Sequence, residues 1–321
     1  MKNHIQNRFL LPALIAGLGL IPTGRATAQT FTNLYNFSVD FEFFNGNVSN
    51  SDGYGPNGSL ILSGKTLYGT ASQGGSWGSG TVFAVTTDGS DFTNLHSFTA
   101  TSGSYPNYTN SDGNNPSAGL ILAGSTLYGT TLWGGSGGAG TVFAINTNGT
   151  GFTTLHSLTN SDGANPSASL ILSGGTLYGI GGNVFAVNTN GSNFTVLMTF
   201  PGGVVYDPDN GTETNSVGYD PVGSLLFSGN TLYGTASAGA IYGSGTVFSI
   251  SLSPQLTIMH SGTNVIVTWP ASFTGFTLEF ATNLVPPTVW QTNSTASVVI
   301  SGQNVVTNPI SGTQKFYRLT Q

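Results

Sequence analysis

A four-residue motif, Thr-Leu-Tyr-Gly, occurs four times in this chain and constrains its fold more than any other feature. The copies stand at 66–69, 126–129, 176–179 and 231–234, so they are 60, 50 and 55 residues apart. Periods of this length are typical of proteins built from stacked copies of one supersecondary unit. The sequence therefore predicts a repeat protein in which four similar units share a continuous core.

Each unit is predicted to contain four short β-strands. An apolar run such as Leu-Ile-Leu precedes Thr-Leu-Tyr-Gly, and Gly-Thr-Val-Phe or Gly-Asn-Val-Phe follows it. A fourth element with the pattern Phe-Thr-x-Leu stands at 92–98, 152–158 and 194–200. The third and fourth elements are separated by Asp-Gly or Asn-Gly, which favour tight hairpin turns: Asp88-Gly89, Asn148-Gly149 and Asn190-Gly191. A four-stranded antiparallel meander of this size corresponds to one blade of a β-propeller.

The position of the fourth element along the chain suggests that the units form a ring. It also occurs before the first unit, at Phe31–Phe37, and it is missing after the last unit, which ends near Ser251. Pairing this spare N-terminal strand with the last three strands would complete a fourth blade and remove an exposed sheet edge. We therefore expect an all-β fold with a four-bladed β-propeller over residues 29–252, closed by the N-terminal strand. An open stack of sheets is the alternative.

The repeat stops near Pro254, and a different pattern follows. Five short segments alternate apolar and polar residues, at 256–260, 264–269, 276–281, 297–300 and 315–319. This alternation predicts a small β-sandwich over residues 253–321. Val265–Pro270 and Phe276–Phe280 look like the second and third strands of a fibronectin type III-like domain, with Trp269 buried between the sheets.

The first 28 residues have the layout of a secretory signal peptide. Lys2 and Arg8 precede an apolar run over 9–21, and Ala26-Thr27-Ala28 forms an A-x-A cleavage signature. The alternative is a membrane anchor, but 13 apolar residues interrupted by Pro and Gly are short for a span. We expect a chain that is secreted to the extracellular space or the cell surface of a bacterium, with no membrane span after cleavage.

Charge and cysteine content exclude several classes of function. Without the signal peptide, three cations (Lys65, Lys315 and Arg318) stand against 12 acidic residues, a net charge of 3 − 12 = −9. So few cations cannot form a basic surface for nucleic acid or anionic lipid. The absence of Cys excludes disulfides, Cys-ligated zinc, thiol catalysis and a lipobox anchor. We expect a monomer.

Three units carry Asn-Ser-Asp-Gly before the first strand, with the carboxylates Asp52, Asp112 and Asp162. Such a set could hold Ca²⁺ together with backbone carbonyls. Asp-Gly followed by Pro is also an ordinary turn sequence, and the fourth unit has Val217 at the expected Asp position. We prefer the turn, and we predict no metal and no cofactor.

Five acidic residues lie outside the repeat pattern, in the irregular loops 38–57 and 201–222: Asp40, Glu42, Asp207, Asp209 and Glu213. Two carboxylates at a suitable separation would support glycoside hydrolysis. A secreted carbohydrate-active enzyme is therefore the alternative function, although no motif links any two of these residues.

The loops also contain aromatic residues among Asn, Asp and Ser. The candidate ligand-binding residues are Trp77, Trp133, Tyr242 and Tyr219, and further loop tyrosines stand at 54, 105, 108 and 206. Aromatic rings beside short polar side chains suit a neutral sugar or an extended protein ligand. We therefore predict a non-catalytic extracellular protein that binds a glycan or a protein through these loops.

The repeat resembles a known family. Asp162-Gly163-Ala164-Asn165-Pro166, the Leu-Ile-Leu strand, Thr-Leu-Tyr-Gly-Thr, Gly-Thr-Val-Phe and Leu-His-Ser-Phe are similar to the GloVer tandem repeat of choice-of-anchor proteins from environmental bacteria. The resemblance covers about 220 residues and all four copies. It implies export and a propeller-like array of repeats, without an established activity.

Overall fold

The computed structural model describes residues 30–38, 42–44, 47–103, 108–200, 205–207, 212–214, 217–240, 242–271, 273, 275–312 and 314–320. For 42–44, 47–48, 205–207 and 212–214 only the backbone is described. Contacts between Cα atoms divide the chain into Met1–Asn33 and Leu34–Gln321. The predicted signal peptide, residues 1–28, lies outside the described residues. Among those described, no helix is long and apolar enough to cross a membrane.

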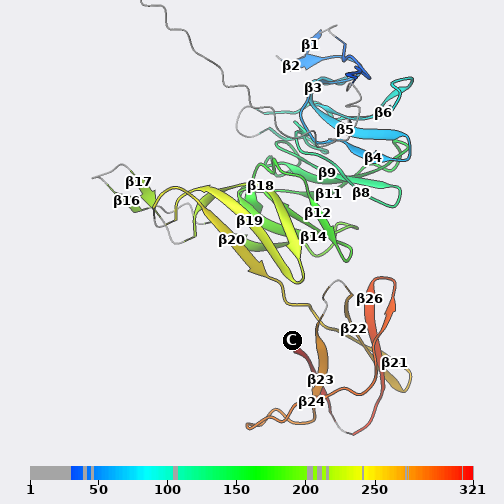
Figure 1. Cartoon of the computed structure of the whole chain (residues 1–321), viewed down its shortest axis with the longest axis vertical. Coiled ribbons are helices and arrows are strands. Elements are labelled where there is room, and N and C mark those ends of the chain that lie inside the picture. The colour runs from blue at the N-terminus through cyan, green and yellow to red at the C-terminus, as the bar shows by residue number, and fades with distance from the viewer. Residues whose placement is uncertain are drawn as a thin grey trace, which may run out of the picture. The chain divides into compact units, whose positions relative to one another are not determined.

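The first three repeats each form an antiparallel sheet in which consecutive strands pair, except that the first two strands of the first repeat both pair with its third strand (Figure 1). In the first repeat the strands are β3 (Tyr54–Pro56), β4 (Ile61–Ser63), β5 (Thr66–Gln73), β6 (Thr81–Thr86) and β7 (Phe92–Ser97). In the second they are β8 (Ile121–Ala123), β9 (Thr126–Thr131), β10 (Thr141–Asn146) and β11 (Thr153–Ser157). In the third they are β12 (Ile171–Ser173), β13 (Thr176–Ile180), β14 (Asn183–Asn188) and β15 (Thr195–Thr199). The predicted blade-like meander is confirmed for these three repeats.

The fourth repeat has three described strands, β18 (Tyr219–Ser228), β19 (Thr231–Ala238) and β20 (Thr246–Ser251), in that order. Short elements lie outside the repeat sheets. The hairpin β1 (Glu42–Phe44)–β2 (Asn47–Ser49) precedes the first repeat, the one-turn helix α1 (Asn160–Gly163) lies between the second and third repeats, and the hairpin β16 (Val205–Asp207)–β17 (Thr212–Thr214) lies between the third and fourth. The helix was not expected from the sequence.

The glycine of Thr-Leu-Tyr-Gly makes room for the phenylalanine ring of Gly-Thr-Val-Phe on the neighbouring strand. Gly129 pairs with Phe143 across β9 and β10, and a Cβ atom on Gly129 would lie 2.6 Å from the Phe143 ring. The same overlap would arise in the other repeats, at Gly69, Gly179 and Gly234. Only glycine leaves room for the ring to lie over the neighbouring strand, which explains why the two motifs always occur together.

Successive repeats pack through two different faces of each sheet. We call the side that carries Tyr128, Val142 and Ala144 in the second repeat the Tyr face, and the side that carries Leu127 and Phe143 the Phe face. The Tyr face of each repeat packs on the Phe face of the next, and the resulting apolar clusters join repeats 1 and 2, 2 and 3, and 3 and 4. Repetition of one interface explains the regular sequence period.

The small residues before the Leu-Ile-Leu run allow neighbouring repeats to approach closely. A Cβ atom on Gly58 would lie 2.6 Å from the carbonyl oxygen of Ala118 in the next repeat. Thr70 Oγ1 donates a hydrogen bond of 2.9 Å to the same carbonyl oxygen. Larger residues here would separate the sheets.

Closure of the ring by the N-terminal strand is not confirmed. Residues 30–38 form no strand, and no described strand pairs with the outer side of β20. Tyr35 and Phe37 lie instead on the Phe face of the first repeat, against Phe83 and Phe92. Burial of these rings on the first repeat accounts for the position of the segment.

The C-terminal segment forms two antiparallel sheets. One has the order β21 (Thr257–Ser261), β22 (Asn264–Pro270), β26 (Gln303–Pro309) and β25 (Val298–Ile300). The other has the order β24 (Gln291–Thr292), β23 (Thr277–Ala281) and β27 (Phe316–Thr320). Trp269 is buried, as predicted, in a cluster with Val267, Leu278 and Val306. The sequence analysis missed β26, because Asn and Pro around Val305 and Val306 resemble a turn.

Candidate functional site

The three aspartates of the Asn-Ser-Asp-Gly turns form the same contact at each junction. Asp112, in the second repeat, accepts hydrogen bonds from the backbone N–H and the hydroxyl of Thr99, at the end of the first repeat. His96 Nε2, on β7, lies 3.0 Å from Asp112 Oδ2. A buried carboxylate thus ties the last strand of one repeat to the first turn of the next. We call this contact the junction clasp.

The clasp recurs on both sides of this junction. Asp162 accepts hydrogen bonds from the N–H and hydroxyl of Thr159, and His156 Nε2 lies 3.4 Å from its Oδ2. At the N-terminal end, Asp52 accepts hydrogen bonds from the N–H and hydroxyl of Ser38 and from the hydroxyl of Tyr35. Tyr35 therefore takes the position that a histidine holds in the next two clasps.

The fourth junction has lost both halves of the clasp. Met198 stands at the histidine position and Val217 at the aspartate position. The loss of both partners at one junction is a signal, visible in the sequence, that they act as a pair. From the sequence alone, a His that recurs on outer strands is interpreted as a half-exposed sheet residue. Its role is not visible there because the aspartate that it contacts lies in the next repeat.

Asparagines of the same turns hold the glycine-rich loops. Asn50 Oδ1 accepts hydrogen bonds from the N–H groups of Gly53 and Gly75, and its amide donates to the carbonyl of Gly53. Asn110 makes the same three bonds in the second repeat. In the first two repeats, the loop between the second and third strands is therefore fixed by the turn that carries the clasp.

These contacts favour a structural role for the three aspartates over a cation site. Among the described residues no group of three or more His, Asp or Glu side chains could hold a metal ion. Protein donors already bond to both carboxylate oxygens of Asp52 and Asp112 and to Oδ2 of Asp162. The turn interpretation explains every contact that these carboxylates make.

The contacts within the clasps shift the pKa values of Asp52, Asp162 and Tyr35. Burial raises the pKa of Asp52, but the hydrogen bonds from Ser38 and Tyr35 outweigh burial, and the pKa is lowered from 3.8. Asp162 behaves in the same way, with burial outweighed by bonds from Thr159 and the neighbouring His156. Burial, followed by the hydrogen bond to Asp52 and its charge, raises the pKa of the Tyr35 hydroxyl to about 12. The clasps of Asp52 and Asp162 are therefore built around ionised carboxylates.

We expect the fold to lose stability in acid through these groups. A carboxylate whose pKa is lowered on folding contributes stability above its unfolded pKa, and this contribution is lost as the pH falls through the folded value. For Asp52 and Asp162 the loss begins near pH 3.8 and continues below it. Denaturant melts from neutral pH down to strong acid measure it. The Asp52→Asn variant should be less stable at neutral pH and show a smaller loss in acid, whereas an unchanged acid dependence would contradict the assignment.

The sequence-predicted aromatic residues occupy two kinds of position. Trp77 and Tyr242 hold equivalent places in the glycine-rich loops of the first and fourth repeats, and their exposed fractions are 42% and 84%. Trp133 lies four residues earlier in its loop and bridges to Asn114 through paired backbone hydrogen bonds. Tyr219 opens β18 and is half-buried. Trp77 and Tyr242 therefore share one end of the repeats, and Trp133 belongs to the same set of loops.

The structure does not describe the side chains of the five candidate acidic residues. Asp40 and Asp209 lie outside the described residues. The backbones of Glu42, Asp207 and Glu213 lie in β1, β16 and β17, where Tyr206 pairs with Glu213 and Asp207 pairs with Thr212. Catalysis by these residues therefore stays a prediction.

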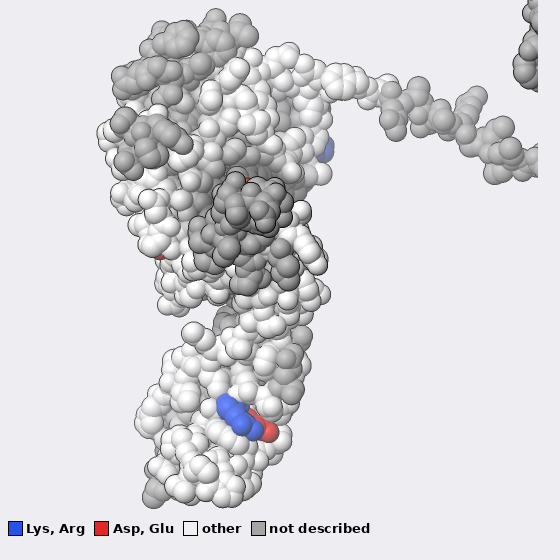
Figure 2. Space-filling model, turned by 90° about the vertical axis from the view of Figure 1, so that its left-hand side faces the viewer, with Lys and Arg blue, Asp and Glu red and all other residues white. Residues whose placement is uncertain are grey.

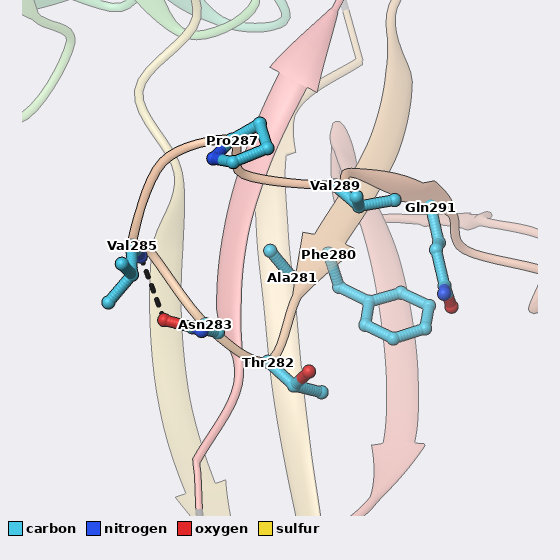
Figure 3. A pocket seen from close by; sticks show the side chains of 8 residues that line it. All are labelled: Phe280, Ala281, Thr282, Asn283, Val285, Pro287, Val289 and Gln291. Carbon is cyan, nitrogen blue, oxygen red and sulfur yellow. Dashed lines mark hydrogen bonds between the residues drawn. The ribbon is translucent and has the colours of Figure 1, made fainter.

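A small cavity that the sequence analysis did not identify lies in the C-terminal sandwich (Figure 3). It has a volume of about 180 Å³ and is lined by Phe280, Ala281, Thr282, Asn283, Val285, Pro287, Val289 and Gln291. Asn283 Oδ1 accepts a hydrogen bond of 2.7 Å from the N–H of Val285, which shapes its wall. The lining holds no ionisable group, so the cavity offers no acid–base chemistry.

Most of the described surface is uncharged. Figure 2 shows a face on which the described residues are mostly neither basic nor acidic. The three cations outside the predicted signal peptide are Lys65, Lys315 and Arg318. Arg318 donates to Glu279 over 2.7 Å and stacks on Trp290, and Lys315 lies 5.0 Å from the centre of the Phe280 ring.

These features define a class of protein: a tandem array of β-propeller-like sheets joined by repeated side-chain clasps. The model of the Gloeobacter/Verrucomicrobia repeat family matches residues 38–216 and 106–274, which together span most of the chain. The chain belongs to this family. The match confirms the predicted repeat protein, while the fibronectin type III-like assignment of the last segment stays a prediction.

Comparison with solved structures gives distant similarities. The chain is similar to a nidogen/laminin complex, with 15% identity and a TM-score of 0.36 over 67% of this chain and 71% of the other. It is similar to a gluconolactonase from Xanthomonas campestris, with 15% identity and a TM-score of 0.36 over 65% of this chain and 63% of the other, less than two thirds of that length. An endo-arabinanase from Bacillus licheniformis has 13% identity and a TM-score of 0.30 over 69% of this chain and 90% of the other. None of the curated proteins compared with this sequence matches it.

Proposed function

We propose that this protein is a secreted, non-catalytic repeat protein of the bacterial cell exterior that binds a neutral glycan through the loops between the second and third strands. The observation that carries the proposal is the exposure of Trp77 and Tyr242 at one equivalent position of two repeats. Exposed aromatic rings in an uncharged, hydroxyl- and amide-rich setting favour the apolar faces and hydroxyl groups of sugars.

The packing of the repeats supports a shared binding surface. Each Tyr face packs on the next Phe face through the same motif positions, so equivalent loops lie at the same end of the array. The junction turns hold these loops through Asn50 and Asn110. Fixed loops reduce the entropy that is lost on binding. The third repeat has only Gly181 and Gly182 between its second and third strands, which leaves a gap in the row of loops.

The C-terminal sandwich has a separate role in this proposal, as a spacer or attachment module. Its own cluster around Trp269 and its two sheets give it an independent core. The fibronectin type III-like topology of this segment and the four blade-like repeats before it remain part of the proposal.

The test is binding of neutral oligosaccharides and polysaccharides to the purified protein, screened on a glycan array and measured by calorimetry. The Trp77→Ala/Trp133→Ala variant should bind at least roughly tenfold more weakly, because aromatic anchors carry a large share of interface energy. Trp290→Ala is the matched control, since Trp290 lies in the sandwich against Arg318, and it should bind as the native chain does.

Three outcomes would contradict the proposal: no neutral glycan binds, the double variant binds as tightly as the native chain, or bound glycan is cleaved. Release of reducing ends that disappears in Asp207→Ala would establish the alternative, a carbohydrate-active enzyme.

A further inference from the structure

The Tyr face of the fourth repeat is exposed, in contrast to the same face in the first three repeats. Val247 is 77% exposed, whereas its counterparts Val82, Val142 and Val184 are 0% exposed. Tyr233 is 41% exposed, against 7% for Tyr128. Large exposed apolar surfaces of this kind mark interaction sites.

The same repeat also lacks a fourth strand. In the first three repeats the third strand pairs on its outer side with β7, β11 or β15. After β20 the chain continues to β21, which pairs with β22 in the C-terminal sandwich. Among the described residues β20 therefore has a row of backbone groups on its outer side without a strand partner. An unpaired edge accepts an added strand readily.

The N-terminal segment has the contacts of a fourth strand that lacks its own sheet. Tyr35 stacks on Phe92 with ring centres 3.7 Å apart, as His96 stacks on Phe152 at 3.8 Å. Ser38 and Tyr35 form the clasp with Asp52. The ring stacking and the clasp bonds that a fourth strand makes to the following repeat are thus present, whereas residues 30–38 pair with no third strand.

We propose that a second copy of this chain docks its N-terminal segment, together with the Phe face of its first repeat, on the Tyr face and the β20 edge of the fourth repeat. The junction between copies then reproduces the junction between repeats. By equivalence with Thr81 opposite Ser97 and Val82 opposite His96, Thr246 pairs with Asn36 of the second copy and Val247 pairs with Tyr35 of that copy. This inference concerns self-association and goes beyond the proposed glycan binding.

The arrangement of the clusters favours a second copy over closure within one chain. In the part of the chain that the structure describes, apolar clusters join repeats 1 to 4 in order, and none joins the fourth repeat to the first. The two complementary surfaces thus lie on the first and last members of the array. An interface between unlike surfaces joins copies head to tail. The proposal therefore replaces the monomer that the sequence alone suggests with a concentration-dependent assembly.

Engineered cysteines provide the direct test, because the chain has no cysteine of its own. Mixing Asn36→Cys with Thr246→Cys under mild oxidation should give a disulfide-linked dimer of the two variants, at least about tenfold more than either variant alone, since docking raises the effective thiol concentration. Asn36→Cys mixed with Val298→Cys, on the sandwich, is the control. Absence of the link would overturn the proposal. A disulfide within single chains of the Asn36→Cys/Thr246→Cys double variant at every dilution would also overturn it, in favour of ring closure.

Sedimentation of the native chain provides a second, independent readout. The average mass should rise with concentration above the mass of one chain, and Val247→Asp should hold it at the monomer value. Val298→Asp, at a valine on the sandwich that is 61% exposed, should leave association unchanged. A native chain that stays monomeric at all concentrations would refute the proposal.

Discussion

Replacing Val142 with Asp should destabilise the protein by roughly 4 kcal/mol or more, because an unpaired carboxylate would be buried where two repeats meet. Val142 has no exposed surface and lies in the cluster between the second and third repeats. A loss of this size approaches the whole stability of many domains, so this repeat should unfold first. Urea or thermal denaturation followed by circular dichroism measures the effect.

The matched variant is Val247→Asp, at the same motif position in the fourth repeat. Its side chain is 77% exposed, so at low protein concentration its stability should stay within about 0.5 kcal/mol of the native value. If Val142→Asp does not fold at all, Val142→Ala keeps the comparison measurable, with an expected loss of about 1–2 kcal/mol. Equal losses at positions 142 and 247 would show that the fourth repeat packs like the others and contradict its exposed face.

Replacing Asp112 with Ala should cost roughly 2–4 kcal/mol, the second largest effect that we expect. The carboxylate is buried and accepts hydrogen bonds from the N–H and hydroxyl of Thr99, with His96 at 3.0 Å. Its removal leaves these donors without their acceptor away from water, which costs more than the net value of the bonds. Denaturant unfolding of the variant measures the loss.

Asp91→Ala is the control for this prediction. Asp91 is an exposed residue of the loop between β6 and β7, so its replacement should change stability by no more than about 0.5 kcal/mol. A His96→Ala variant tests the pair further, because the combined Asp112→Ala/His96→Ala loss should be smaller than the sum of the single losses. Additive losses would show that the two side chains do not act together.

The strand pattern of the first three repeats was predictable because each signal is local. Asn-Gly and Asp-Gly turns, apolar alternation and the spacing of Thr-Leu-Tyr-Gly from Gly-Thr-Val-Phe each act within one hairpin. The strands β7, β11 and β15 lie within one residue of the predicted boundaries. Strand β26 was missed because its residues are ordinary for a turn, and only pairing with β22 and β25 makes them a strand.

The candidate site was predictable only in part. The sequence identified Trp77, Trp133, Tyr219 and Tyr242 as loop aromatics, and the structure shows that only Trp77 and Tyr242 hold equivalent positions in their loops. The aspartates lie in turns, but the partners of Asp112, His96 and Thr99, lie in the preceding repeat. Sequence spacing alone does not determine which groups meet across a junction.

The Thr-Leu-Tyr-Gly period by itself determined that this chain is a β-repeat protein, since glycine at that position and phenylalanine on the neighbouring strand require each other. The tertiary structure decided which faces of the repeats are covered and which partner each clasp residue finds. Val142 and Val247 occupy the same place in the same motif, and only packing buries one and exposes the other. The physical reason is that burial depends on the neighbouring sheet, which the local sequence of a repeat does not encode.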